Sequence, residues 1–216
     1  MANPDWFETD PALAWAFYGH RLNLYRQTVP HVGFQLLLKA AAQKPMGYFI
    51  FTSNVDGHFQ KAGFASDRIV ECHGSIHHLQ CTQNCTSEIW DADGTEVALD
   101  ETTFRATGTL PRCKYCAQLA RPNILMFGDA IWQSQRSNEQ HEKFDAWIRN
   151  LDSRLVIIEI GAGSAIPTVR YTSERMAALT RGTLIRVNPR EPEVPAGHLS
   201  VPLNAAEGLQ KIFRKN

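Results

Sequence analysis

Two stretches near the start of the chain repeat apolar residues at the spacing of an amphipathic helix. The first covers residues 12–26, and Asp10 followed by Pro11 is typical of a helix cap and a first helical residue. The second covers residues 31–42 and ends before Pro45. The pattern therefore predicts two helices before the first strand.

Continuous apolar runs predict buried strands. The clearest is Arg154–Ile160, whose aliphatic run suits a parallel sheet that is covered on both faces. Shorter runs predict strands at 48–52, 69–70, 183–187 and 199–203, and helical patterns follow at 141–151, 165–179 and 205–214. This alternation predicts an α/β fold with a Rossmann-like parallel sheet and helices on both faces.

The pattern changes between residues 77 and 120, where small polar residues and turn signals replace the periodic segments. This region is too poor in apolar residues to be stabilised by burial alone. Apolar character returns at residues 121–128. We therefore expect a discontinuous Rossmann-like domain over 1–76 and 121–216, with 77–120 as a small zinc-ribbon module.

Composition and charge narrow the classes of partner. The 216 residues are 44% hydrophobic and 20% charged, which is ordinary for one large domain or for a domain with an inserted module. Basic and acidic residues number 22 each, so electrostatics do not favour nucleic acid or an anionic membrane as a partner. The sequence shows neither a spanning apolar run nor a secretory signal, and a cytoplasmic, reducing setting is expected. No pattern indicates an oligomeric state.

Four of the five cysteines form two close pairs, Cys81 with Cys85 and Cys113 with Cys116. Each short loop allows two thiolates to converge on one ion, so the pairs together predict a closed, structural zinc site. The alternatives are two unrelated pairs or a redox C-x2-C motif. His77 and His78 are rival ligands, but four thiolates already complete the shell. Cys72 is expected to be a small buried residue.

Polar or flexible residues follow four of the predicted strands. They are Ser53, Asn54 and Asp56, then His73, then Gly161, Gly163 and Ser164, and finally Asn188 and Arg190. Ligands of open α/β sheets bind beyond the carboxyl ends of strands, and glycines there permit close approach of a phosphate or ribose. Each group alone is a weak signal, and Asn54 to Gly57 also reads as a simple turn. The prediction of a site depends on all four groups lying along one sheet edge.

Six blocks of the chain resemble the sirtuin (Sir2) family of NAD-dependent protein deacylases. Thr52-Ser-Asn-Val-Asp-Gly57 is similar to T-Q-N-V-D-G, and Glu71-Cys-His-Gly-Ser75 is similar to E-L-H-G-S. The paired cysteines match the zinc ligands of the family. The remaining matches are Arg121–Asp129 with L-R-P-x-V-V-x-F-G-E, Gly161–Gly163 with G-T-S, and Val187–Glu191 with the I-N-x-E block.

The resemblance implies a role for each matching residue. His73 would be the general base acting on the nicotinamide ribose, Asn54 would place that ribose and a water, and Asp56 would bind the carboxamide. The resemblance implies contacts with the rest of NAD for Ser53, Gly161, Gly163, Ser164 and Asn188. The acyl-lysine peptide would pair with Leu125, Met126, Phe127 and Gly128 as an added strand. The products would be nicotinamide, free lysine and O-acyl-ADP-ribose.

A narrower match concerns the acyl group. Phe17-Tyr18-Gly-His-Arg21 resembles the F-Y-x-x-R of sirtuins that remove acidic acyl groups such as succinyl or malonyl. Tyr18 and Arg21 would then bind the distal carboxylate, Arg21 through a charge-assisted pair. The alternative is one turn of an amphipathic helix with an exposed arginine.

The chain also departs from the family pattern. The opening strand with G-A-G-x-S and the following G-I-P-D-F-R loop find no match at the N-terminus, and Ser53, Cys72 and Asp129 replace Gln, Leu and Glu. Since that opening normally supplies a strand and the pyrophosphate loop, we expect weak or no activity from these 216 residues alone. The competing interpretations are an NAD hydrolase or ADP-ribosyltransferase of the same fold, and a non-catalytic zinc-ribbon interaction module.

Overall fold

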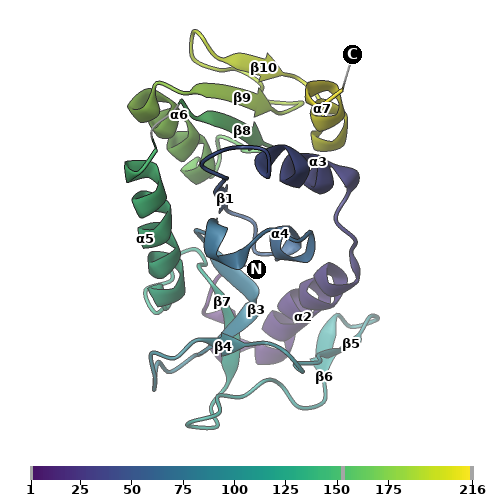
Figure 1. Cartoon of the computed structure of the whole chain (residues 1–216). Helices are drawn as coiled ribbons and strands as arrows, with labels where there is room; N and C mark the ends of the chain where they lie inside the picture. The colour runs from purple at the N-terminus through teal and green to yellow at the C-terminus, as the bar shows by residue number, and fades with distance from the viewer. Residues whose placement is uncertain (1, 152–153, 215–216) are drawn as a thin grey trace. The chain divides into compact units, whose positions relative to one another are not determined.

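The structure is a computed structural model, and it describes residues 2–151 and 154–214 (Figure 1). The chain divides into two compact units, each assembled from three separate segments. Unit 1 comprises Met1–Val29, Thr52–His58 and Val70–His141, and unit 2 comprises Pro30–Phe51, Phe59–Ile69 and Glu142–Asn216. Strands alternate with helices along the chain, so the α/β class is confirmed. The expected division into a Rossmann-like domain over 1–76 and 121–216 and a zinc-ribbon module over 77–120 stays a prediction.

Unit 1 is built around one long helix and an antiparallel sheet. Helix α2 (Pro11–Gln27) begins as expected, with the Leu13 N–H donating to Asp10 Oδ1 at 3.2 Å. The short helix α1 (Trp6–Thr9) precedes it. The sheet consists of β4 (Trp90–Asp91), β3 (Gly74–Cys81) and β7 (Ala120–Ile124), and β5 (Ala98–Asp100) pairs with β6 (Arg105–Thr107).

The core of unit 1 forms between α2 and these strands. Trp15 is fully buried, and its indole N–H donates to the Ala120 carbonyl at 3.0 Å. Gly19 lets the helix approach Val97 closely, because a Cβ there would lie 2.5 Å from a Val97 methyl carbon. Leu79, Ala92 and Val97 belong to this core, so the region 77–120 is stabilised partly by packing against α2.

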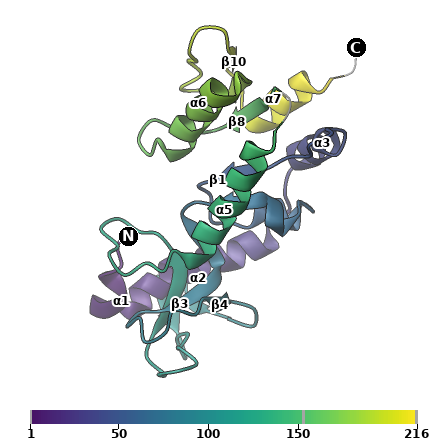
Figure 2. The ribbon, with the colours of Figure 1, turned by 60° about the vertical axis from the view of Figure 1, so that its left-hand side comes forward.

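Unit 2 contains a three-stranded parallel sheet in the order β10 (Leu199–Val201), β9 (Thr183–Val187), β8 (Val156–Ile160). Helices α6 (Thr168–Thr180) and α7 (Ala205–Ile212) lie beside it (Figures 1 and 2). Gly208 permits the close packing of α7, since a Cβ there would lie 2.4 Å from a Val187 methyl carbon. Helix α3 (Val32–Ala41) packs against α7.

Several expected elements differ in extent. Strand β1 (Ile50–Thr52) is shorter than residues 48–52, and α5 (Gln135–Arg149) begins well before residue 141. Strand β3 was not expected at all, nor were α4 (His58–Lys61) and a short 3-10 helix (Ser66–Arg68). No helix among residues 2–151 and 154–214 is long and apolar enough to cross a bilayer.

One expectation about the sheet is wrong. Strand β1 pairs only with β2 (Ile69–Glu71) within the described chain, in a sheet separate from β8–β10. The four polar strand ends therefore belong to two sheets and not to one edge.

Candidate active site and metal centre

His73 occupies a tight connection between β2 and β3, and several backbone contacts fix it. The Cys72 N–H donates to the Thr52 carbonyl at 3.0 Å, and the Leu125 N–H donates to the His73 carbonyl at 3.0 Å. Gly74 follows with φ of +79°, and a Cβ there would lie 2.0 Å from the Asn123 carbonyl oxygen. The connection therefore requires glycine at position 74, and its geometry sets the position of the imidazole.

The His73 ring is half-buried, and its environment favours the neutral form. Burial lowers its pKa from the usual 6.5, and a hydrogen bond to the backbone of Ser53 opposes part of that shift. A contact of one ring nitrogen with the Ser53 backbone would leave the second nitrogen to carry the free lone pair. A neutral imidazole with one oriented nitrogen is suited to accept a proton.

Asn54 and Asp56 lie in a loop of the same unit, directly after β1. The Asn54 side chain is exposed, and the residue's N–H donates to Thr52 Oγ1 at 3.1 Å. Asp56 Oδ1 accepts from the His58 N–H at 2.9 Å, while Oδ2 lies 3.5 Å from His58 Nδ1. The loop is thus a defined turn, as one interpretation of the sequence held, and it also fixes the orientation of a carboxylate.

The segment Leu125–Gly128 follows β7 and presents alternating exposure. Leu125 and Phe127 are exposed, Phe127 at 70%, whereas Met126 between them is buried. The Phe127 N–H donates to the Ala2 carbonyl at 3.0 Å, so one backbone donor of this segment is already used. A peptide that adds to this edge would compete with Ala2 for that donor.

Tyr18 and Arg21 lie on α2. Tyr18 is buried, and this burial raises the pKa of its hydroxyl to about 12. The Arg21 guanidinium carbon lies 3.5 Å from the centre of the Phe17 ring, and Nη1 donates to the Phe17 carbonyl at 3.1 Å. In this structure Arg21 folds back onto its own helix, so a carboxylate ligand would have to draw it away from Phe17.

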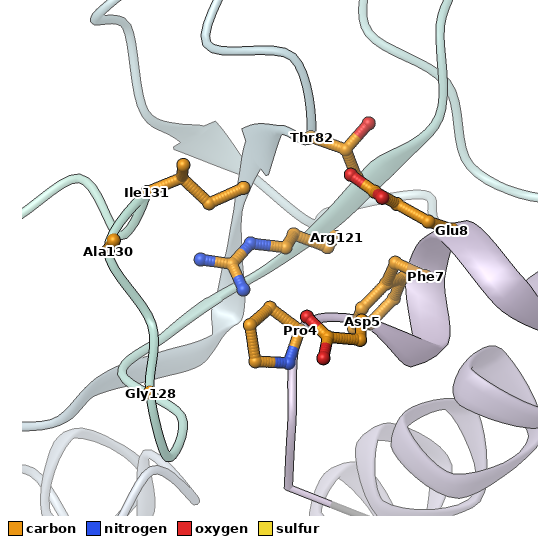
Figure 3. A pocket seen from close by; sticks show the side chains of 9 residues that line it. All are labelled: Pro4, Asp5, Phe7, Glu8, Thr82, Arg121, Gly128, Ala130 and Ile131. Carbon is orange, nitrogen blue, oxygen red and sulfur yellow. The ribbon is translucent and has the colours of Figure 1, made fainter.

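A separate cavity of about 190 Å³ lies between the start of the chain and the residues after Gly128. Figure 3 shows the Arg121 guanidinium within it, between Pro4 and Ile131. Arg121 is fully buried, and Nη2 donates to both carboxylate oxygens of Asp129, at 2.9 and 2.7 Å. None of the nine residues that line the cavity is a predicted catalytic residue.

The four paired cysteines come together. The Cys81 and Cys116 sulfurs are 3.6 Å apart, as are those of Cys85 and Cys113, and all four lie within 4.8 Å of one another. A tetrahedral zinc ion with Zn–S bonds of about 2.3 Å separates its sulfur ligands by about 3.8 Å. The cluster therefore fits a four-thiolate zinc site, which leaves no coordination position open for catalysis.

The rival ligands are engaged elsewhere. His77 Nε2 lies 2.9 Å from the Asp56 carbonyl oxygen, and His78 Nε2 lies 3.2 Å from Asp91 Oδ1. Cys72 is buried outside the cluster, and burial raises its thiol pKa to about 12, as expected for an unreactive buried residue.

The remaining predicted residues lie in unit 2, at the carboxyl ends of β8 and β9. Gly161 has φ of +67°, and its N–H donates to the Val187 carbonyl at 2.9 Å. The Asn188 side chain donates to the Ala162 carbonyl at 3.0 Å. Gly163 and Ser164 follow in the same loop, so this group is brought together within its unit.

Sequence reasoning missed Glu191 as a member of this group. Its carboxylate accepts from the Ser164 N–H at 2.7 Å and from the Ser164 hydroxyl at 2.9 Å, and these bonds lower its pKa. Asn188 Oδ1 in turn accepts the Glu191 N–H at 3.0 Å. The signal was present, because Glu191 closes the Val187–Glu191 block, but the contact with Ser164 has no sequence signature.

Comparison with known proteins places the chain in a family. The sequence model of the Sir2 family matches residues 1–163. The chain belongs to the Sir2 family. The sirtuin resemblance is thereby confirmed for at least this part of the chain.

Named relatives extend the match. An NAD-dependent protein deacylase of Deinococcus radiodurans is 30% identical over 99% of this chain and 79% of that protein. Another, from Aquifex aeolicus, is 26% identical over 99% of this chain and 80% of its own length. A solved chain from "The Structural basis of Sirtuin Substrate Affinity" shares the fold, with a TM-score of 0.68, 19% identity, and coverage of 96% of this chain and 78% of that one.

Proposed function

We propose that the chain is an NAD-dependent protein-lysine deacylase. The observation that carries the proposal is the setting of His73: a neutral, oriented imidazole in the Glu71–Ser75 block of a Sir2-family chain. Relatives named NAD-dependent protein deacylase that align with nearly the whole chain support it. The substrates would be NAD and an acyl-lysine protein or peptide.

His73 is the proposed general base. NAD, when bound, would supply the electrophilic ribose carbon and the nicotinamide leaving group. The second nitrogen of His73 would take a proton from a ribose hydroxyl, because the first is engaged with Ser53. The rate should therefore fall when acid protonates His73, through a pKa below 6.5.

The other predicted residues take binding roles in this proposal. Asn54 and Ser53 would contact the ribose, and the fixed carboxylate of Asp56 would accept from the nicotinamide carboxamide. The residues at the carboxyl ends of β8 and β9 would contact the rest of NAD. They are Gly161, Gly163, Ser164 and Asn188. We assign NAD and substrate binding to residues 1–76 and 121–216.

The acyl-lysine peptide would pair with Leu125–Gly128 as an added strand. The exposure of Leu125 and Phe127 supports this edge, and Met126 anchors it in the core. Tyr18 and Arg21 would select an acidic acyl group, succinyl or malonyl, if Arg21 leaves Phe17 for the distal carboxylate. Succinyl-lysine is therefore our second candidate substrate beside acetyl-lysine.

Zinc would have a structural role in the module at residues 77–120. Thiolate ligands keep the metal only while reduced, so a reducing compartment such as the cytoplasm suits this site.

The test is incubation of the zinc-loaded chain with NAD and acetyl- or succinyl-lysine peptide, with products separated by mass spectrometry. We expect slow, peptide-dependent release of nicotinamide and O-acyl-ADP-ribose, in line with the weak activity expected from the sequence, and loss of both in His73→Ala. Nicotinamide release that needs no peptide would instead indicate an NAD hydrolase. NAD binding without turnover, unchanged in His73→Ala, would indicate a non-catalytic module.

A further inference from the structure

Three side chains of helix α5 contact the same residue of strand β2. The residue is Glu71, which is buried and ends the strand. Its N–H donates to Gln140 Oε1 at 3.0 Å, and its carbonyl accepts from Ser137 Oγ at 2.9 Å. Its carboxylate accepts from Arg136 Nη2 and, at 3.4 Å, from Gln140 Nε2.

This arrangement replaces an ordinary strand neighbour. Strand β2 pairs with β1, and the backbone N–H and C=O of Glu71 go to side chains of α5 instead of to another strand. The side-chain amide of Gln140 acts as both donor and acceptor, as a peptide group does. It accepts from the backbone N–H of Glu71 and donates to the Glu71 carboxylate. The end of β2 therefore depends on α5 for its position.

Glu71 is separated from His73 by Cys72 alone. Successive residues along a strand are only about 3.3 Å apart. A displacement of Glu71 would therefore also move the backbone of His73, and with it the imidazole. On the downstream side, His73 is already fixed by Leu125 and by the close approach of Gly74 to Asn123. The contacts of α5 act on the upstream side of the same connection.

Stability alone does not explain these contacts. Glu71 Oε1 and Arg136 Nη1 are buried and find no hydrogen-bond partner among the described residues. Burying incompletely paired charges is costly, and an apolar pair of similar volume often serves stability as well. What the charged contacts do achieve is a unique position for the end of β2.

We propose that three side chains of α5 are positioning residues for His73. They are Arg136, Ser137 and Gln140. They fix the position of Glu71, and through the backbone between Glu71 and His73 they fix the position and orientation of the imidazole. The proposal rests on the proposed deacylase function and adds a second element, remote in sequence, to its catalytic geometry.

The test uses the full zinc-loaded chain with Gln140→Met and Arg136→Met. Glu139→Gln is the matched control, because Glu139 is exposed on the same helix. We expect both Met variants to lower kcat by roughly tenfold to a hundredfold, as small misplacements of a catalytic group do, with KM for the acyl peptide nearly unchanged. Arg136→Lys should recover part of the loss.

A second readout needs no turnover. In chains with ¹⁵N-labelled histidine, with the His73 signals assigned by their absence in His73→Gln, both Met variants should shift these ring signals and Glu139→Gln should not. Unchanged His73 signals in the Met variants, or an equal effect of Glu139→Gln, would overturn the proposal. If the unmodified chain shows no deacylation, the proposed function fails, and the ring signals alone decide whether α5 positions His73.

Discussion

Asp129 neutralises Arg121 in the interior of unit 1, and both side chains are fully shielded from solvent. The same carboxylate accepts the Met126 N–H at 3.3 Å, in the middle of the proposed peptide-binding segment. The ion pair therefore links the strand β7 to the turn that would present Leu125–Gly128 to a peptide.

Replacing Asp129 by Asn should expose the importance of this pair. The change leaves the Arg121 charge buried without a counter-ion, which typically destabilises a protein by about 3–5 kcal/mol. Urea unfolding would measure the loss, and KM for the acyl peptide should rise as the turn loosens. Asp129→Glu keeps the negative charge and introduces the residue of the family pattern, so its stability should lie between those of Asp129→Asn and the unmodified chain. Equal stability of Asp129→Asn and the unmodified chain would refute the link.

Zinc content should follow the paired cysteines and no other cysteine. Cys113→Ser removes one of four thiolates, so we expect far less than one zinc per chain by elemental analysis and a lower Tm. Cys72→Ala is the control, because Cys72 is a buried thiol outside the cluster. Purified, unmodified chain without zinc, or zinc loss in the control, would argue against the four-thiolate site.

His78 should make the fold sensitive to mild acid. Burial, aided by the Arg136 charge, lowers its pKa to about 4 in spite of Asp91 and Glu71 nearby. The unfolded chain therefore binds this proton first, so stability is complete above about 6.5 and declines as pH falls toward 4. The loss attributable to this group is at most about 3 kcal/mol.

His78→Gln removes the titrating ring and should flatten that decline. The measurement is the free energy of unfolding at several pH values between 4 and 7 for both chains. His20→Gln is a suitable comparison, because His20 is exposed. A decline of the same slope in His78→Gln would show that other groups cause it.

The acyl preference should depend on Arg21. Arg21→Met keeps the apolar contact with Phe17 but removes the guanidinium, so succinyl-lysine should lose its charge-assisted partner. We expect kcat/KM on succinyl peptide to fall roughly tenfold or more, a loss of about 1.4 kcal/mol or more, with acetyl peptide little changed. An equal loss on both peptides would favour the simple amphipathic-helix interpretation.

The sequence predicted best those features that are local. The cap at Asp10, the helix after it and the cysteine pairs all follow from residues close together in the chain. Strand β3 was not predicted, because His77 and His78 interrupt its apolar pattern. Its burial comes from contacts with α2 and β7. Long-range packing of this kind overrides local propensity.

The same limit applies to the candidate site. His73, Asn54 and Asp56 could be named because each belongs to a short recognisable block. The contacts of α5 with Glu71 could not be predicted, because the α5 residues that make them lie 65 to 69 positions away from Glu71 in the sequence. The start of α5 at Gln135 was missed for a related reason, since its first turns are polar and serve buried polar contacts.

The segmented make-up of the two units has a consequence for synthesis on the ribosome. Every segment of unit 1, including all four paired cysteines, has been translated by His141, whereas unit 2 still requires Glu142–Asn216. Unit 1 can thus fold and load its metal while the rest of the chain is being made. During that interval Pro30–Phe51 and Phe59–Ile69 can form the apolar cluster around Phe64, but they still lack their contacts with Glu142–Asn216. The nascent chain should therefore need most protection from aggregation after its metal centre is already complete.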